Sequence, residues 1–138
     1  MKESLTAGII HEFKYTVPES KIVPNLYPEA AEFQEMPHVF ATGFLVGLIE
    51  WTCIQAITPH IDWPKEQSVG IMINLNHTAA TPPGLIVTVK VHLVEVAGKR
   101  LIFEFEASDG IDSICKGSHE RFIINSEKFV DKLKTKTL

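Results

Sequence analysis

Glu50 is the only charged residue in an otherwise apolar segment that runs from Val39 to Ile57. An isolated carboxylate among apolar side chains costs free energy unless it is paired or has a function. A functional Glu50 would take a proton from water or attack the substrate itself. The alternative is that Glu50 lies at an exposed or dimer-facing edge of this segment.

His77 and Gly70 are the next candidates for chemistry. His77 ends a predicted strand and precedes a turn of small residues and prolines, where a side chain is held yet reachable. A neutral imidazole there would relay a proton, although a loop histidine bonded to a backbone carbonyl is the alternative. Gly70 interrupts a strand, which indicates either a close approach by a ligand or a simple bulge. Its backbone N–H could stabilise the negative charge that develops on a carbonyl oxygen.

Thr42 comes near the start of the apolar segment, and this position is typical of a helix N-cap. Eight residues at a rise of 1.5 Å would place Thr42 and Glu50 about 12 Å apart along an ideal helix. The two side chains cannot bond directly at that separation. Either the chain bends before the first turn, or both reach one extended substrate from different ends.

A long helix is expected to carry these residues. The segment from Phe40 to Ile57 contains no proline and Pro59 ends it, which predicts a helix that is hydrophobic almost all round. A strand is predicted over Ile9–Val17. The stretch Ser20–His38 between them contains three prolines and predicts a long loop with one helical turn around Glu29–Glu35. Loops of this length often form lids or binding surfaces.

Four further strands and a C-terminal helix follow the predicted long helix. Apolar alternation and turn residues predict strands over Ser68–Asn76, Leu85–Val96, Leu101–Ser108 and Ser113–Ile124. The tail predicts a short amphipathic helix capped by Ser126. The predicted fold class is α+β, with an antiparallel sheet of about five strands wrapped around one long apolar helix. Because such a sheet leaves open edges, we expect a homodimer.

Composition limits the possible partners and compartment. The 138 residues predict a single domain, and the net charge of −4 argues against nucleic acid and anionic membranes as partners. Cys53 and Cys115 form no CxxC pair and have no metal-ligand spacing, so we expect reduced packing residues and no metal site. The apolar run from Ala7 to Ile10 is too short for the core of a signal peptide, so we expect a cytoplasmic protein. A membrane span over Val39–Ile57 is disfavoured because Glu50 would be costly in lipid.

Three segments, LYPEAAEFQEMPHVFATGFLVGLIEW, NHTAATPPG and GSHERF, occur in an order and spacing that closely resemble the hotdog-fold thioesterases. Within them the chain resembles the fluoroacetyl-CoA thioesterase group. The resemblance implies a hotdog fold, a homodimer, and hydrolysis of short acyl-CoA thioesters without a cofactor other than the coenzyme A of the substrate. It assigns the catalytic threonine, glutamate and histidine to Thr42, Glu50 and His77. It also places Gly70 near the thioester carbonyl and Arg121 near the active site.

One position departs from the pattern of that group. The lid segment reads Glu35, Met36, Pro37, where the group usually carries phenylalanine in place of Met36. Phe33 and Val39, which belong to the same substrate-binding region, still match. Because methionine is flexible, a pocket closed by Met36 should discriminate less sharply among small acyl groups.

Two other functions are compatible with the same fold. A hydratase or dehydratase would need an acid–base pair aimed at the acyl Cα and Cβ, and the threonine, glutamate and histidine set argues against it. A non-catalytic acyl-CoA sensor would bind without turnover. In either case the phosphates of coenzyme A need local cations, and the candidates are Arg121, Lys116, Lys99 and Arg100.

Overall fold

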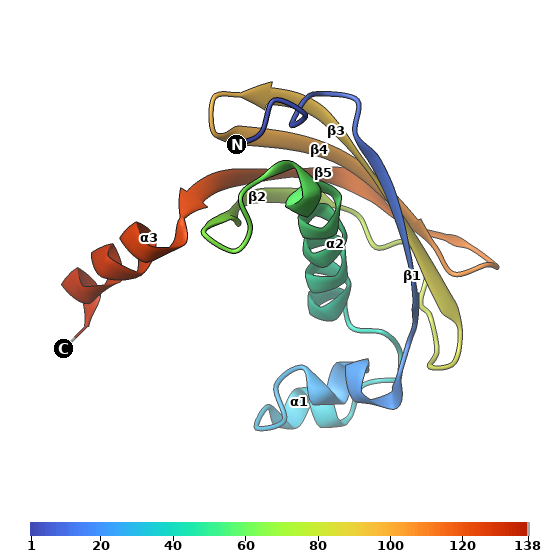
Figure 1. The fold of residues 1–138 in the computed structure, drawn as a ribbon. Helices are drawn as coiled ribbons and strands as arrows, with labels where there is room; N and C mark the ends of the chain where they lie inside the picture. The colour runs from blue at the N-terminus through green and yellow to red at the C-terminus, as the bar shows by residue number, and fades with distance from the viewer. Residues whose placement is uncertain (138) are drawn as a thin grey trace.

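One five-stranded antiparallel sheet forms the body of the protein in the computed structural model, which describes residues 1–137. The strands lie in the order β1-β3-β4-β5-β2 (Figure 1). They span Ile10–Thr16 (β1), Glu66–Leu75 (β2), Ile86–Ala97 (β3), Arg100–Ser108 (β4) and Ser113–Asn125 (β5). All five predicted strands are therefore confirmed, with small shifts at their ends.

The long helix α2 (Thr42–Ile57) lies inside the curve of the sheet and contacts β1 and β3 (Figure 1). It begins two residues later than predicted, because Phe40 forms an isolated β-bridge with Ile22 and Ala41 is extended. The shorter helices are α1 (Ala31–Gln34) and α3 (Ser126–Leu133), and the 3-10 turns are η1 (Glu19–Lys21), η2 (Val23–Asn25), η3 (Thr58–His60) and η4 (Lys134–Lys136). The α+β arrangement of one sheet around one helix is confirmed.

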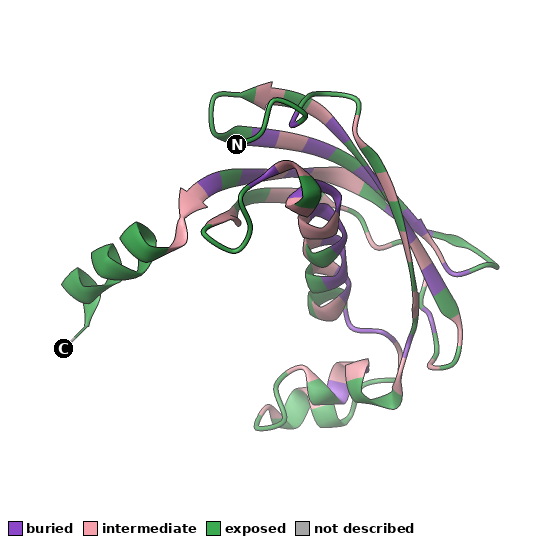
Figure 2. Cartoon of the chain, in the orientation of Figure 1, coloured by how far each residue is buried: buried purple, intermediate pink, exposed green. Residues whose placement is uncertain are grey.

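The hydrophobic core lies between α2 and the sheet (Figure 2). From α2, Leu45 and Ile49 are fully buried. The buried residues of β3 and β4 are among the ones that the alternation predicted: Val87, Val89, Val91, Leu93, Leu101, Phe103, Phe105 and Ala107. Burial of these alternating faces fixes the register of the sheet, because a slip by one residue would turn every one of them outward.

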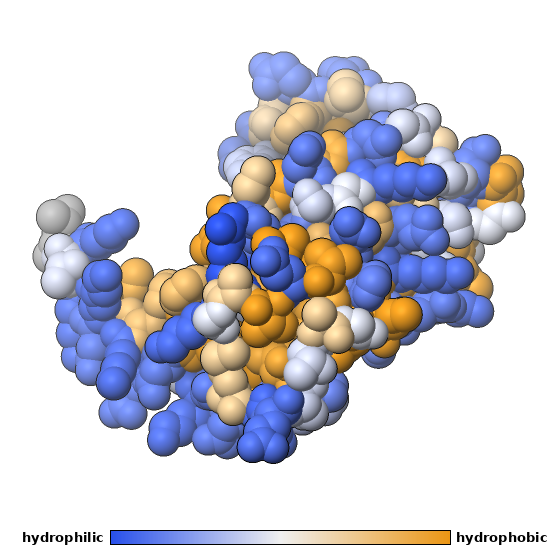
Figure 3. All heavy atoms as spheres, turned by 90° about the horizontal axis from the view of Figure 1, so that it is seen from above, coloured by the Kyte–Doolittle hydropathy of each residue, from blue (hydrophilic) through white to orange (hydrophobic). Residues whose placement is uncertain are grey.

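Strand β2 is one of the two edges of the sheet, and it carries an irregularity beside Gly70. The pairing with β5 shifts register between Gly70 and Met72, which leaves Ile71 as an extra residue. Both Ile71 and Met72 are exposed. Figure 3 shows hydrophobic side chains near the middle of one molecular face, with hydrophilic ones around them.

The C-terminal helix α3 extends away from the sheet (Figure 1). Its cap is Asn125, whose side chain accepts a hydrogen bond from the backbone N–H of Lys128. The predicted cap, Ser126, is instead the first residue of the helix. The predicted cap is therefore off by one residue. Asparagine and serine cap helices about equally well, so their residue types alone do not distinguish the two positions.

Both cysteines are free and buried, as predicted. Burial raises the pKa of the Cys53 thiol to about 12 and that of Cys115 to about 11, so both remain protonated at neutral pH. Within residues 1–137, no helix is long and apolar enough to cross a membrane.

Candidate active site

Thr42 and His77 form a direct hydrogen bond at the start of α2. The Oγ1 atom of Thr42 lies 2.8 Å from Nδ1 of His77, which follows β2 in the chain. Ala41 is the N-cap residue of α2 and makes no side-chain capping bond. The N-cap role considered for Thr42 is therefore wrong, as is the backbone-carbonyl partner considered for His77, and their side chains bond each other instead.

The imidazole of His77 combines burial with one unused nitrogen. Its Nε2 is buried and has no hydrogen-bond partner within the described residues 1–137. Burial lowers the pKa of His77 below its ordinary value, so the ring is neutral at pH 7. A neutral ring with one nitrogen uncommitted is suited to accept or pass on a proton.

A groove of about 290 Å³ lies beside this pair. It is lined by Val23, Val39, Phe40, Thr42 and residues 77–80. Of the predicted substrate-binding residues, Val39 thus lies with Thr42 and His77 at the groove. The volume of the groove suits a small group, and apolar side chains such as Val23, Val39 and Phe40 form part of its lining.

The loop after His77 is held in place by the buried carboxylate of Asp109. The hydroxyl of Thr81 donates to Asp109 over 2.8 Å, and the carbonyl of Thr81 accepts from the backbone N–H of Phe40 over 2.8 Å. Asp109 also accepts from the backbone N–H groups of Ile111 and Asp112. Burial opposes the charge, but these hydrogen bonds outweigh it and lower the pKa of Asp109. The loop that carries His77 is therefore tied to the turn between β4 and β5.

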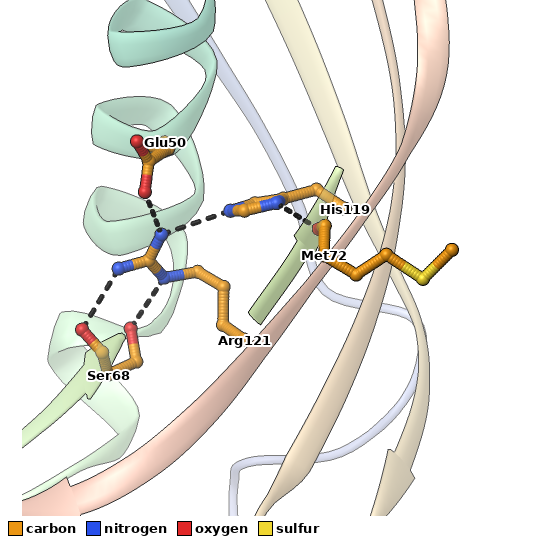
Figure 4. A network of polar contacts seen from close by, with 5 residues as sticks. All are labelled: Glu50, Ser68, Met72, His119 and Arg121. Carbon is orange, nitrogen blue, oxygen red and sulfur yellow. Dashed lines mark hydrogen bonds and ion pairs between the residues drawn. The ribbon is translucent and has the colours of Figure 1, made fainter. Parts of the chain in front are cut away.

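Glu50 lies farther along α2 and forms an ion pair with Arg121 of β5 (Figure 4). Nη1 of Arg121 donates to Oε2 of Glu50 over 2.9 Å. The Arg121 side chain is 3% exposed and that of Glu50 is 38% exposed. The arginine is thus enclosed, whereas part of the carboxylate still reaches solvent. The pairing accounts for a carboxylate in an apolar helix.

Arg121 makes further hydrogen bonds to β2. Its Nε donates to Oγ of Ser68 over 2.7 Å and its Nη2 donates to the Ser68 carbonyl over 2.9 Å (Figure 4). Together with the Glu50 bond, these contacts occupy all three guanidinium nitrogens. The suggestion that Arg121 binds the phosphates of coenzyme A is therefore wrong, because the buried guanidinium is already committed. Arg100, another candidate, pairs with Glu120 over 2.6 Å.

His119 completes this network and was not singled out from the sequence. Its Nε2 lies 3.0 Å from Nη1 of Arg121, and its Nδ1 lies 2.8 Å from the carbonyl oxygen of Met72. Residues two apart on a strand share a face, and this rule alone pairs His119 with Arg121.

Gly70 lies against the same network. It is opposite Arg121 in the pairing of β2 with β5. A Cβ atom at Gly70 would lie 2.9 Å from Oε2 of Glu50 and 3.2 Å from Cε1 of His119. The absence of a side chain at Gly70 therefore allows Glu50 and His119 to lie close to the backbone of β2. The bulge that was the alternative prediction is also present, directly after Gly70 at Ile71.

The candidate residues thus lie in three separate regions rather than in one site. Thr42 and His77 are bonded at the first turn of α2, whereas Glu50 is held by Arg121 eight residues later. Phe33 and Met36 belong to a third region around α1, where the rings of Phe33 and Tyr27 lie 6.1 Å apart and Met36 is exposed. Neither lines the groove beside Thr42 and His77.

The arrangement of one long helix in a curved antiparallel sheet is that of the hotdog proteins. A hot-dog-like protein from Thermanaerovibrio acidaminovorans matches with a TM-score of 0.79 at 17% identity, over 96% of this chain and 93% of that one. This likeness confirms the hotdog fold. The sequence profile of the fluoroacetyl-CoA-specific thioesterases matches residues 24–127, and the chain belongs to that family.

Two closer relatives support the same membership over the full chain. A fluoroacetyl-CoA thioesterase of Streptantibioticus cattleyicolor is 49% identical over 137 residues, which are 99% of this chain and 98% of the relative. A crystal structure of a variant of the fluoroacetyl-CoA thioesterase FlK, in complex with acetyl-CoA, matches with a TM-score of 0.94 at 48% identity, over 97% of this chain and all of that one. The prediction of a thioester hydrolase is confirmed.

Substitution of Gly70 by alanine tests the close packing around Glu50. The added methyl group would displace the Glu50 carboxylate from Arg121, so we expect Gly70→Ala to lower kcat/KM for thioester hydrolysis by about ten- to a hundredfold. The control is Gly47→Ala, because a Cβ at Gly47 meets no atom within 4 Å. Gly47→Ala should stay within about twofold of the parent enzyme. Equal activity of both variants would contradict the role of Gly70.

Proposed function

We propose that this protein hydrolyses short acyl-CoA thioesters to the free acid and coenzyme A, with fluoroacetyl-CoA or a broader set of small acyl groups as substrates. The observation that carries the proposal is the Thr42–His77 hydrogen bond, which lies beside a groove at the start of α2. The same helix carries Glu50, which is held by Arg121. The named activity of the full-length relatives supports it. The reaction needs water and the thioester, and no further cofactor.

Glu50 is the proposed base. It accepts a proton from water, the water oxygen bonds to the thioester carbonyl carbon, and the C–S bond breaks to release the coenzyme A thiolate, which takes up a proton. Arg121 fixes one oxygen of the carboxylate, while the partial exposure of Glu50 leaves access for water. Fixing the base in this way avoids the cost of orienting it during the reaction.

Thr42, His77 and Gly70 are the proposed partners of Glu50. The neutral His77 ring orients the Thr42 hydroxyl through Nδ1 and keeps Nε2 for a proton of the substrate or water. Gly70 brings backbone close to the carboxylate, and its N–H is the proposed donor to the thioester carbonyl. The substrate would then extend between the two groups, because Thr42 and Glu50 are separated by about 12 Å along the helix.

The acyl preference is proposed to depend on Met36 together with Phe33 and Val39. Met36 is exposed and flexible, in contrast to the hydrogen-bonded Thr42, Glu50 and His77. A wall of this kind adapts to several small acyl groups. We therefore expect broader turnover than a rigid aromatic side chain at this position would allow.

A homodimer that joins through β2 is proposed as the working state. β2 is an edge strand whose Ile71 and Met72 are exposed, and an unpaired edge leaves backbone N–H and C=O groups without partners. Pairing with β2 of a second copy would cover this edge. Since Gly70 lies on the same strand, the second copy would lie beside the Glu50 site. A cytoplasmic location remains a prediction.

Release of coenzyme A from acetyl, fluoroacetyl, propionyl, longer-chain and aromatic thioesters tests the proposed reaction. We expect turnover of the short acyl groups, and a loss of about a hundred- to ten-thousandfold in kcat for Glu50→Gln, because the amide cannot act as a base. The control is Glu104→Gln, which changes an exposed glutamate of β4. A folded and fully active Glu50→Gln would overturn the role of Glu50. Tight acyl-CoA binding without turnover would instead indicate a sensor.

Replacement of Met36 by phenylalanine tests the origin of acyl preference. We expect Met36→Phe to raise the ratio of kcat/KM for fluoroacetyl-CoA over acetyl-CoA by about tenfold, because a rigid ring fits one acyl group more closely. Leu133→Phe, an exposed change on α3, is the matched control. If the ratio is unchanged in Met36→Phe, residue 36 does not set the discrimination.

Sedimentation equilibrium tests the proposed dimer. We expect the parent protein to have twice the mass of one chain and Ile71→Lys to shift towards the monomer, because a lysine on an edge strand opposes pairing. Ile111→Lys places the same charge at an exposed isoleucine in the turn between β4 and β5 and should leave the mass unchanged. A parent protein that sediments as a monomer at micromolar concentration would refute the dimer.

A further inference from the structure

His119 is buried between a hydrogen-bond donor, the Arg121 guanidinium, and a hydrogen-bond acceptor, the Met72 carbonyl. It is 2% exposed and lies on the inward face of β5. Its ring touches Arg121 through Nε2 and the Met72 carbonyl, at the bulge of β2, through Nδ1 (Figure 4). The ring therefore links the irregular part of the edge strand to the arginine that holds Glu50.

These two partners determine the protonation of the ring. The Met72 carbonyl only accepts hydrogen bonds, so Nδ1 of His119 must carry the hydrogen. The guanidinium of Arg121 only donates, so Nε2 must present its lone pair. His119 is therefore the neutral Nδ1–H tautomer, and the two hydrogens on Nη1 of Arg121 go to Glu50 and His119.

We propose that His119 is a positioning residue of the hydrolase, which holds Arg121 against Glu50 as long as its ring is neutral and releases it when the ring is protonated. This inference rests on the function proposed above. Protonation would place an N–H of His119 against an N–H of Arg121, which removes one hydrogen bond and brings two cations together. The Glu50 carboxylate would then lose part of its fixed orientation.

The surroundings of His119 favour the neutral ring. Burial makes the largest contribution and lowers its pKa; Arg121 also lowers it, whereas the Met72 hydrogen bond and the charges of Glu50 and Glu120 act in the opposite direction. The register partners of His119, Phe103 on β4 and Ile73 on β2, carry no charge. On α2, the buried Cys53 thiol stays neutral because burial raises its pKa to about 12.

The direction of the pH effect follows from the lowered pKa. Above the ordinary histidine pKa of about 6.5, the ring is neutral in both folded and unfolded chains. As the pH falls below that value, the unfolded chain binds the proton first, so stability declines. Orientation of Glu50 is lost only at still lower pH, where His119 itself is protonated in the folded protein.

Two variants separate hydrogen bonding from ionisation. In His119→Gln, the side-chain oxygen can accept from Arg121 and the amide can donate to Met72, but the group does not titrate. His119→Leu fills the space and makes neither bond. His92→Gln, at an exposed position of β3, is the matched control.

The first measurement is nitrogen-15 NMR of the histidine rings and of the Arg121 side chain in the parent protein and the variants. We expect His119 to be the Nδ1–H tautomer at pH 7 and to titrate below the ordinary histidine pKa. We also expect the hydrogens on Nη1 of Arg121, one of which lies against His119, to exchange slowly in the parent protein and in His119→Gln, and to exchange faster in His119→Leu. An Nε2–H tautomer, an ordinary titration, or an unchanged Arg121 signal in His119→Leu would overturn the proposal.

The second measurement is the pH dependence of kcat with the acyl-CoA that is turned over fastest. His119→Leu should lower kcat about ten- to a hundredfold with little change in KM, since one hydrogen bond to a charged group is lost. His119→Gln should keep kcat within about threefold and lose one ionisation from the acidic limb, whereas His92→Gln should match the parent. A folded His119→Leu with unchanged kcat, or an unchanged acidic limb in His119→Gln, would overturn the proposal. If the parent protein hydrolyses no acyl-CoA, the proposed function fails. The NMR result then decides alone whether the His119 ring holds the Arg121 side chain in place.

Discussion

The site depends on one buried cation. Arg121 is almost fully enclosed, and a buried guanidinium is costly unless most of its N–H groups are bonded. Its partners come from different elements: Ser68 from β2, His119 from its own strand β5 and Glu50 from α2. Because these partners must all be in place at once, the arginine fixes the helix against the edge of the sheet. A deletion of any one partner would leave a buried donor unsatisfied, which costs more than the bond itself contributes.

The helix supplies the second constraint. α2 is apolar on nearly every side, so it is stable only inside the curved sheet, and this enclosure sets its rotation. The rotation in turn places Thr42 at the groove with His77 and Glu50 beside Arg121 and Gly70. The two groups of the site are therefore held at a fixed separation by a single rigid element. Rigid placement of this kind favours one extended substrate over two independent reactions.

Most of the fold could be predicted because its signals are local. The alternation of apolar and polar residues along β3 and β4 predicts strands with one buried face, whatever packs against that face. Pro59 likewise predicts the end of the long helix without reference to the rest of the fold. The partners of Thr42 and Arg121 could not be predicted, since their bonds join residues far apart in the chain. From the sequence, a threonine at the start of a helix is as compatible with an N-cap role as with a bond to a distant side chain. Only the position of His77 in the fold distinguishes the two. His119 was within reach of sequence reasoning, because its spacing from Arg121 places both on one face of a strand.

Chemistry and acyl preference are separate properties of this chain. Thr42, Glu50 and His77 are fixed by hydrogen bonds between the helix, the sheet and an anchored loop. Met36 lies outside that network, exposed in the segment between β1 and α2. A substitution there therefore leaves the hydrogen bonds of Thr42, Glu50 and His77 intact. Similarity over the whole chain is therefore strong evidence for the reaction type, whereas the proposed origin of the acyl preference is one side chain that differs from the usual phenylalanine.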